Sequence, residues 1–227
     1  MQTAFCFSGE LRSIDKTISL IKTNVVDSFD STDVFVHLWE DDPNIHKLKY
    51  LTDNLNVVDI VTEPRITFDE KAFASNKREE VNIQGFLRQL YCLRRCNEQK
   101  RKQEEKQKTI YDIVCRIRPD ILINPDTRIE SMIYDLNKIY VPRHDAWYGQ
   151  NDRLYFGSST NMDILSNRID FIDDYYTYGG CMHYETFLLF VATLHEIEFD
   201  YLSVEFGLLR DNGNYIPPTY GIPLHYT

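Results

Sequence analysis

Three short apolar runs near the start of the chain alternate with segments of helical spacing, and this alternation constrains the fold most. They cover residues 3–7, 33–39 and 56–61 and are rich in residues that favour strands. Apolar residues recur every three or four positions over residues 11–26, and residues 48–55 predict a second, shorter helix. Strands that alternate with helices at this spacing predict a parallel sheet with right-handed crossovers. We expect a single α/β domain over residues 1–227, with a mostly parallel central sheet flanked by helices.

A fourth apolar run, residues 113–117, leads into a charged turn. Proline cannot donate a hydrogen bond to a sheet ladder, so regular pairing is expected to stop at Pro119. Asp120 then stands at the carboxyl end of a central strand, the edge at which open α/β sheets bind ligands. Arg116 and Arg118 add permanent positive charge suited to phosphate or carboxylate. The sequence therefore predicts an active-site rim at this turn.

The first run ends at Ser8-Gly9, and Arg12 follows at the start of the expected helix. Small residues there let the backbone approach a ligand, and a helix N-terminus attracts phosphate. An ordinary helix N-cap is the alternative, and the two readings carry equal weight. Because neither GxGxxG nor GxxxxGK[ST] occurs, the turn is not a dinucleotide fingerprint or a P-loop. Parallel strands share one carboxyl edge, so Ser8 is expected on the same rim as Asp120.

Two acids in the second half are candidate catalytic residues. Asp152 lies in a turn after Trp147-Tyr148-Gly149, where it could orient a sugar hydroxyl or act as a base; an Asx-turn is the alternative. Glu185 opens a predicted helix after two glycines, as a general base or as a complement to the helix dipole. A cation at Asp120 would need further ligands, and His225 in the tail could reach it.

Composition limits the class of partner. A net charge of −10 argues against a general nucleic-acid binder, although local arginines or a metal could still hold a nucleotide. The five cysteines form no CxxC pair and are expected to be half-buried, reduced thiols. We find no signal peptide or transmembrane segment and expect a cytoplasmic protein. The mixed-charge run at residues 97–108 predicts a solvated helix end.

Several segments together carry a family resemblance. They are residues 7–12, 33–39, 111–120, 151–157 and 183–185. In order and spacing they resemble small GT-A-type glycosyltransferases found in large DNA viruses, such as chlorella viruses, and in bacterial surface-polysaccharide loci. The resemblance spans roughly residues 3 to 195, and the fold it implies is a Rossmann-like GT-A domain.

The resemblance implies a nucleotide-sugar donor, UDP- or GDP-linked, lying over the first strands and contacted by Ser8, Gly9 and Arg12. It also implies Mn²⁺ or Mg²⁺ bridging the donor diphosphate to the acids of a D-x-D motif. Here the motif reads Arg118-Pro119-Asp120, so only its second acid is present. The metal would then be held by Asp120 with His225, in keeping with the C-terminal histidine ligand of many GT-A enzymes. Alternatively, Arg116 and Arg118 would supply much of the neutralising charge.

The implied activity is transfer of a hexosyl, deoxyhexosyl or pentosyl group to a glycan acceptor that is free, lipid-linked or protein-linked. If the reaction inverts, Asp152 or Glu185 deprotonates the acceptor hydroxyl. Trp39 and Trp147 would wall the cleft or belong to the core. Two alternatives stay open: a non-catalytic nucleotide- or glycan-binding domain on the same fold, and a phosphoester hydrolase using Asp120 as a metal ligand.

Overall fold

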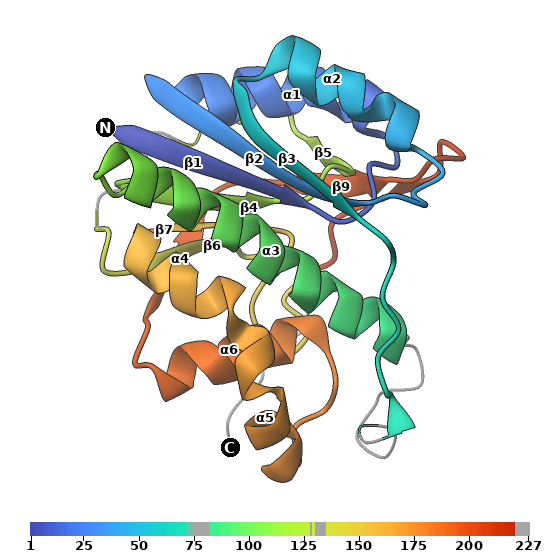
Figure 1. Ribbon diagram of the computed structural model, residues 1–227, viewed down its shortest axis with the longest axis vertical. Coiled ribbons are helices and arrows are strands. Elements are labelled where there is room, and N and C mark those ends of the chain that lie inside the picture. Colours follow the sequence, from blue (N-terminus) through green and yellow to red (C-terminus); the bar gives the residue numbers. More distant parts are fainter. Residues whose placement is uncertain (72, 74–81, 128, 130–134, 221–227) are drawn as a thin grey trace.

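The computed structural model describes all residues except 72, 74–81, 128, 130–134 and 221–227. Among the described residues, a seven-stranded sheet has the order β3-β2-β1-β4-β7-β6-β8 (Figure 1). Its strands are β1 (Gln2–Ser8), β2 (Ser31–Trp39), β3 (Val57–Glu63), β4 (Ile113–Ile117), β6 (Ile139–Pro142), β7 (Leu154–Gly157) and β8 (Phe199–Leu202). The strands β3, β2, β1 and β4 are parallel, as are β6 and β8, whereas β7 is antiparallel to both of its neighbours. The expected mostly parallel α/β sheet is therefore confirmed.

Helices cover both faces of the sheet (Figure 1). They are α1 (Ile14–Asn24), α2 (Leu48–Asn54), α3 (Ile83–Gln107), α4 (Ser159–Ser166), α5 (Ile172–Thr177) and α6 (Tyr184–Leu194). The first two pack on one face, where buried side chains such as Ile18 and Leu51 meet Phe5 of β1. The other four pack on the opposite face, around Phe86 and Phe187. Because both faces are covered, the central strands are apolar almost throughout, which explains why their pattern is a run rather than an alternation.

A second, three-stranded sheet in the described structure brings the chain's C-terminal part to the site. It has the order β10-β9-β5 and is formed by β5 (Ile121–Ile123), β9 (Phe206–Leu209) and β10 (Tyr215–Ile216). The chain leaves the main sheet at Pro119, as the sequence predicts, and β5 pairs antiparallel with β9 instead. The apolar pattern predicts no strand after residue 195. Strands β9 and β10 are short, and β9 pairs with β5, which is far away in the sequence and therefore absent from a local pattern.

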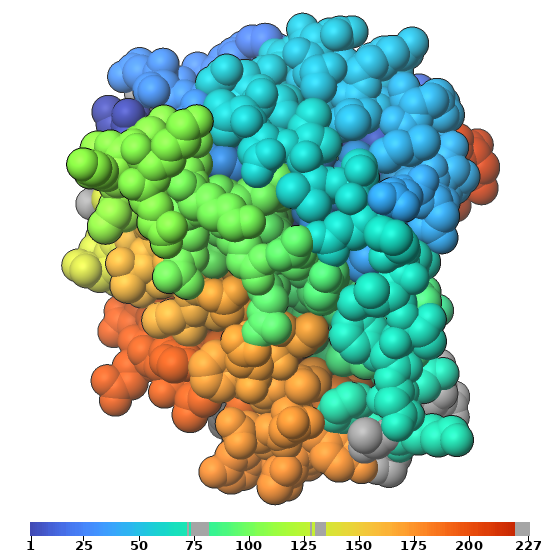
Figure 2. All heavy atoms as spheres, in the orientation of Figure 1, coloured from blue at the N-terminus to red at the C-terminus, as the bar shows by residue number. Residues whose placement is uncertain are grey.

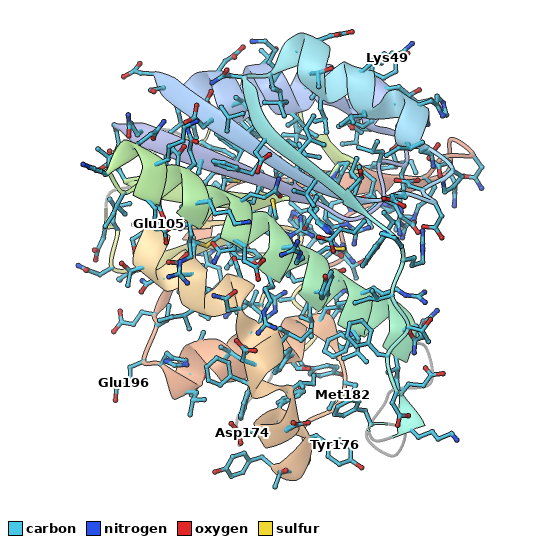
Figure 3. All side chains as sticks on the ribbon, in the orientation of Figure 1. Lys49, Glu105, Asp174, Tyr176, Met182 and Glu196 are labelled. Carbon is cyan, nitrogen blue, oxygen red and sulfur yellow. The ribbon has the colours of Figure 1, made fainter. Side chains whose placement is uncertain are left out.

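The long helix α3 contains the mixed-charge run, and it crosses the face shown in Figure 2. The solvated helix end expected there is confirmed for residues 101–108, which are exposed or half-buried, but the run begins with buried residues. Lys100 is 0% exposed and bonds to Asp163 at 2.7 Å and Glu104 at 3.0 Å. Glu105, by contrast, points into solvent (Figure 3).

A 3₁₀ turn, Arg168–Phe171, separates α4 from α5. All five cysteines are free thiols, and all but Cys181 are buried. Across the described part of the chain, no helix combines the length and the apolar character that a membrane crossing requires.

Candidate active site

A cavity of about 490 Å³ lies at the carboxyl edge of the parallel strands, beneath the N-terminal half of α3. This is within the usual size of small-molecule sites. Eight residues singled out from the sequence line it: Ser8, Gly9, Arg12, Arg116, Arg118, Asp120, Asp152 and Glu185. The ninth, His225, lies outside the described residues. The structure thus brings together residues from the first strand, the fourth strand and the second half of the chain.

Arginines dominate the charge of the cavity. Of the fourteen arginines in the sequence, half line the cavity. These seven are Arg12, Arg65, Arg88, Arg116, Arg118, Arg153 and Arg210. Four carboxylates line it too, so seven positive charges against four negative ones leave a formal charge of +3. The whole protein carries −10, and acids such as Glu105, Asp174 and Glu196 point away into solvent (Figure 3). Positive charge gathered in one cavity of an acidic protein favours an anionic ligand.

Asp120 is the centre of a guanidinium cluster. It is 1% exposed, and Arg118 binds it in a bidentate manner, with Nε 2.9 Å from Oδ1 and Nη2 2.8 Å from Oδ2. Arg12 Nη1 donates to Oδ2 at 2.7 Å, and Arg210 Nη1 donates to the same oxygen at 3.0 Å. Burial alone would raise the pKa of Asp120, but the charges of Arg118 and Arg12 hold it well below the usual range. The carboxylate is therefore ionised, and both of its oxygen atoms accept hydrogen bonds from arginine.

The backbone around this cluster is tightly held. Thr17 Oγ1 donates to the carbonyl oxygen of Pro119 at 2.6 Å, and the Leu209 N–H donates to that of Asp120 at 2.9 Å. Arg12 has φ 42°, a left-handed conformation that is costly for a residue with a β-carbon, and its carbonyl accepts from Lys47 Nζ at 2.5 Å. Such strain persists only where surrounding contacts impose it, and it concentrates at functional sites.

Arg116 lines the same cavity, but it differs from the other arginines in its burial and hydrogen bonding. It is 1% exposed, and within the described residues its Nε and Nη1 atoms have no hydrogen-bond partner. Burial lowers the pKa of Arg116, because a guanidinium removed from water loses hydration. A buried cation with unsatisfied donors is costly, so its position in the cavity wall indicates a binding partner that is an anion.

The two candidate acids line the same cavity as the arginine cluster. Asn151 Oδ1 accepts a hydrogen bond from the Arg153 backbone N–H at 2.9 Å, so the Asx-turn is formed by Asn151 and not by Asp152. The Asp152 side chain lines the cavity. Gln89 of α3 donates to Asp152 Oδ2. Glu185 is 4% exposed in the first turn of α6, and burial, followed by the nearby Asp152 charge, raises the pKa of Glu185 to about 8. A carboxyl group with a pKa near neutrality suits acid–base chemistry.

The loop before Asp152 is fitted closely to Glu185. The Gln150 N–H donates to the Glu185 carbonyl oxygen at 3.1 Å, and a β-carbon on Gly149 would come within 2.0 Å of that oxygen. Trp147 and Tyr148 in this loop have φ 41° and 68° and are 40% and 59% exposed. Trp147 does not line the cavity, whereas Trp39 does, packed on Tyr91 with ring centroids 5.8 Å apart.

Several cavity residues were not expected from the sequence. Arg153 is adjacent to Asp152 and is held by Asp145 at 2.5 Å. Gln89 is hidden in an ordinary helical pattern, and Arg210 follows a strand that forms only through distant pairing. No local signal marks either residue, since both reach the cavity through tertiary structure.

Comparison with known proteins identifies a family and finds distant structural likenesses. A family described as "Domain of unknown function (DUF7796)" matches residues 1–226. No curated protein sequence gives a significant match. The apo crystal structure of mouse xyloside xylosyltransferase 1 is similar with a TM-score of 0.43 and 10% identity, over 88% of this chain and 84% of that chain. The family match covers nearly the whole chain, and the protein therefore belongs to the DUF7796 family.

Proposed function

We propose that this protein is a glycosyltransferase of GT-A type that moves a sugar from a nucleotide-sugar donor, UDP- or GDP-linked, to a glycan acceptor. One observation carries the proposal: a single cavity is lined both by the guanidinium cluster around Asp120 and by two buried carboxyl groups, Asp152 and Glu185. Glycosyl transfer needs both features, since a diphosphate leaves while an acceptor hydroxyl loses a proton. The resemblance to small viral and bacterial enzymes of this type, read from the sequence, supports the same activity.

The chemistry assigns a role to each side of the cavity. The acceptor oxygen forms a bond to the anomeric carbon, and the bond from that carbon to the diphosphate oxygen breaks, leaving its electron pair on the diphosphate. Arg12, Arg118 and Arg210 stabilise this developing negative charge from fixed positions. The acceptor proton passes to a carboxylate, and Glu185 is the better candidate because its ionised form, the minor one at neutral pH, is a stronger base than an ordinary carboxylate, with a pKa of about 8. Asp152 raises that pKa through its own charge.

The donor and acceptor sides of the cavity differ in composition. Ser8, Gly9 and Arg116 lie on the side of the first strands, where the donor is placed. The loop of Trp147 and Tyr148 packs beside Glu185 and presents exposed aromatic surface. Aromatic rings that are exposed beside a polar cavity offer a face on which a sugar ring can stack. We place the glycan acceptor on this side.

The test combines binding with turnover. Purified protein is mixed with UDP-, GDP-, dTDP- and CMP-linked sugars, with and without Mn²⁺, and the melting temperature is recorded. A ligand that binds only the folded state stabilises it by about 2.7 kcal/mol at a hundredfold excess over Kd. The donor that binds is then incubated with a panel of glycans, and nucleoside diphosphate release is measured.

Each outcome has a defined meaning. Release of nucleoside diphosphate that requires an acceptor, and that is lost in Glu185→Gln while donor binding is kept, supports the proposal. Donor binding without turnover on any glycan would make the chain a non-catalytic binding domain. Phosphate release that does not depend on an acceptor would make it a hydrolase.

A further inference from the structure

The guanidinium cluster around Asp120 has the wrong chemistry for a divalent-cation site. Four N–H groups from Arg12, Arg118 and Arg210 converge on this carboxylate, three on Oδ2 and one on Oδ1, and the positive charges of the three guanidiniums repel a cation. Mg²⁺ and Mn²⁺ prefer oxygen ligands whose lone pairs are available. Within the described part of the chain, no group of three or more histidine, cysteine, aspartate or glutamate side chains could hold a metal. The residues present therefore do not fit the Mn²⁺ or Mg²⁺ that the family resemblance implies.

The same cluster has the right chemistry for two phosphoryl groups. Three guanidiniums and one carboxylate leave a formal charge of +2, and Arg116 adds a further cation nearby in the wall. The diphosphate of a nucleotide-sugar carries about two negative charges. Guanidinium groups bind phosphate through paired N–H donors with a geometry that lysine cannot reproduce. Charge and donor geometry therefore match a diphosphate without an added cation.

Asp120 has a clear role in this arrangement, which is to orient the arginines. It takes only one N–H from Arg12 and one from Arg210, so each of these side chains keeps further donors. The side chains of Arg12 and Arg210 are 29% and 34% exposed, which places them at the accessible part of the cavity wall. Arg116, with two unpartnered nitrogen atoms among the described residues, supplies donors from the buried part.

From these observations we infer that the cavity binds the diphosphate of its donor through Arg12, Arg116, Arg118 and Arg210, without a divalent cation. Asp120 holds three of these arginines in place and is a positioning residue, not a metal ligand. This inference rests on the proposed function, because that function identifies the anion as a nucleotide-linked diphosphate.

The test is isothermal titration of the protein with pyrophosphate, UDP and GDP, in EDTA and again in excess Mn²⁺. We expect pyrophosphate and one nucleotide to bind in EDTA with a Kd within about threefold of the value in Mn²⁺. Arg210→Gln should weaken binding about tenfold or more, because hydrogen bonds to charged groups contribute 1.5–3 kcal/mol each. The matched control is Arg143→Gln, an exposed arginine over the ring of Tyr201, which should leave Kd unchanged.

Asp120→Asn separates the two roles of the carboxylate. If Asp120 positions arginines and holds no metal, the variant binds pyrophosphate more weakly than wild type in EDTA, and Mn²⁺ does not change the Kd of either protein. Arg210→Gln gives the answer independently if Asp120→Asn does not fold.

The outcomes separate this inference from the proposed function. Binding that appears only with Mn²⁺ and is lost in Asp120→Asn would overturn the inference and leave the transferase proposal standing. Binding of pyrophosphate in EDTA with no binding of any nucleotide would retain the anion site and count against the transferase. If no probe binds under either condition, the inference is wrong.

Discussion

Glu185→Gln should make the protein more stable, and by an amount that depends on pH. Burial, followed by the Asp152 charge, raises the pKa of Glu185 from 4.5 to about 8. Each pKa unit corresponds to about 1.4 kcal/mol, so ionising this group costs about 5 kcal/mol more in the folded protein than in the unfolded chain. Glutamine keeps nearly the same shape and carries no charge, so the variant does not bear this cost.

The direction in which stability changes with pH follows from the number of protons that the folded and unfolded states bind. Between pH 4.5 and about 8 the folded protein holds a proton on Glu185 that the unfolded chain has released. The contribution of protonated Glu185 to the stability of the wild-type protein is therefore fully present below pH 4.5 and is lost as pH rises to about 8. Above that pH the difference from the Glu185→Gln variant stays constant. At pH 5 the expected advantage of Glu185→Gln is about 1 kcal/mol, and at pH 9 it is on the order of 4 to 5 kcal/mol.

Urea unfolding at pH 5, 7 and 9 measures this difference, because the free energy of unfolding extrapolates linearly in denaturant. The control is Glu198→Gln, whose parent side chain is 75% exposed and should show no comparable pH dependence relative to wild type. A constant stability difference between Glu185→Gln and wild type across this pH range would refute the assignment of Glu185 as a buried, protonated carboxyl group.

Three further predictions follow from the same structure. Asp152→Asn removes a charge that raises the pKa of Glu185, so the acidic limb of kcat/KM against pH should move about one unit lower. Gly149→Ala places a β-carbon within 2.0 Å of the Glu185 carbonyl oxygen and should destabilise by about 2 kcal/mol or more in urea. Gly85→Ala is the control: its new β-carbon has its nearest neighbouring atom at 3.5 Å, so stability should change by less than about 1 kcal/mol. Equal losses of stability in Gly149→Ala and Gly85→Ala would contradict the packing argument. Lys100→Ala removes a buried cation from its partly buried partners Asp163 and Glu104 and should lower stability by about 1–3 kcal/mol, and an unchanged melting temperature would rule this out.

The central fold follows from local sequence because both faces of the sheet are covered. Strand residues such as Phe5, Phe35 and Val114 are buried, so β1, β2 and β4 appear as continuous apolar runs. The second sheet could not be predicted in this way. Its strand β10 has only two residues, and β9 is stabilised by pairing with β5, which lies more than eighty positions away.

The site was predictable where residues stand at strand ends. Ser8 and Asp120 directly follow apolar runs, and parallel strands necessarily bring such positions to one edge. Arg210 was not predictable, because it reaches Asp120 only through the pairing of β9 with β5. The burial of Lys100 was also unexpected, because the mixed charges around it are typical of a solvated helix and its acidic partner Asp163 belongs to α4.

The inference of a cation-free anion site joins the arginine cluster to the D-x-D motif that the resemblance to GT-A enzymes implies. Under that resemblance, Arg118 stands at the position of the motif's first aspartate. Exchanging an aspartate for an arginine changes the local charge by two units, which is the charge of one divalent cation. Arg118 also binds Asp120, the acid that remains, through two hydrogen bonds. If the inference holds, one side chain thus supplies the charge of the cation and binds the acid that would be its ligand.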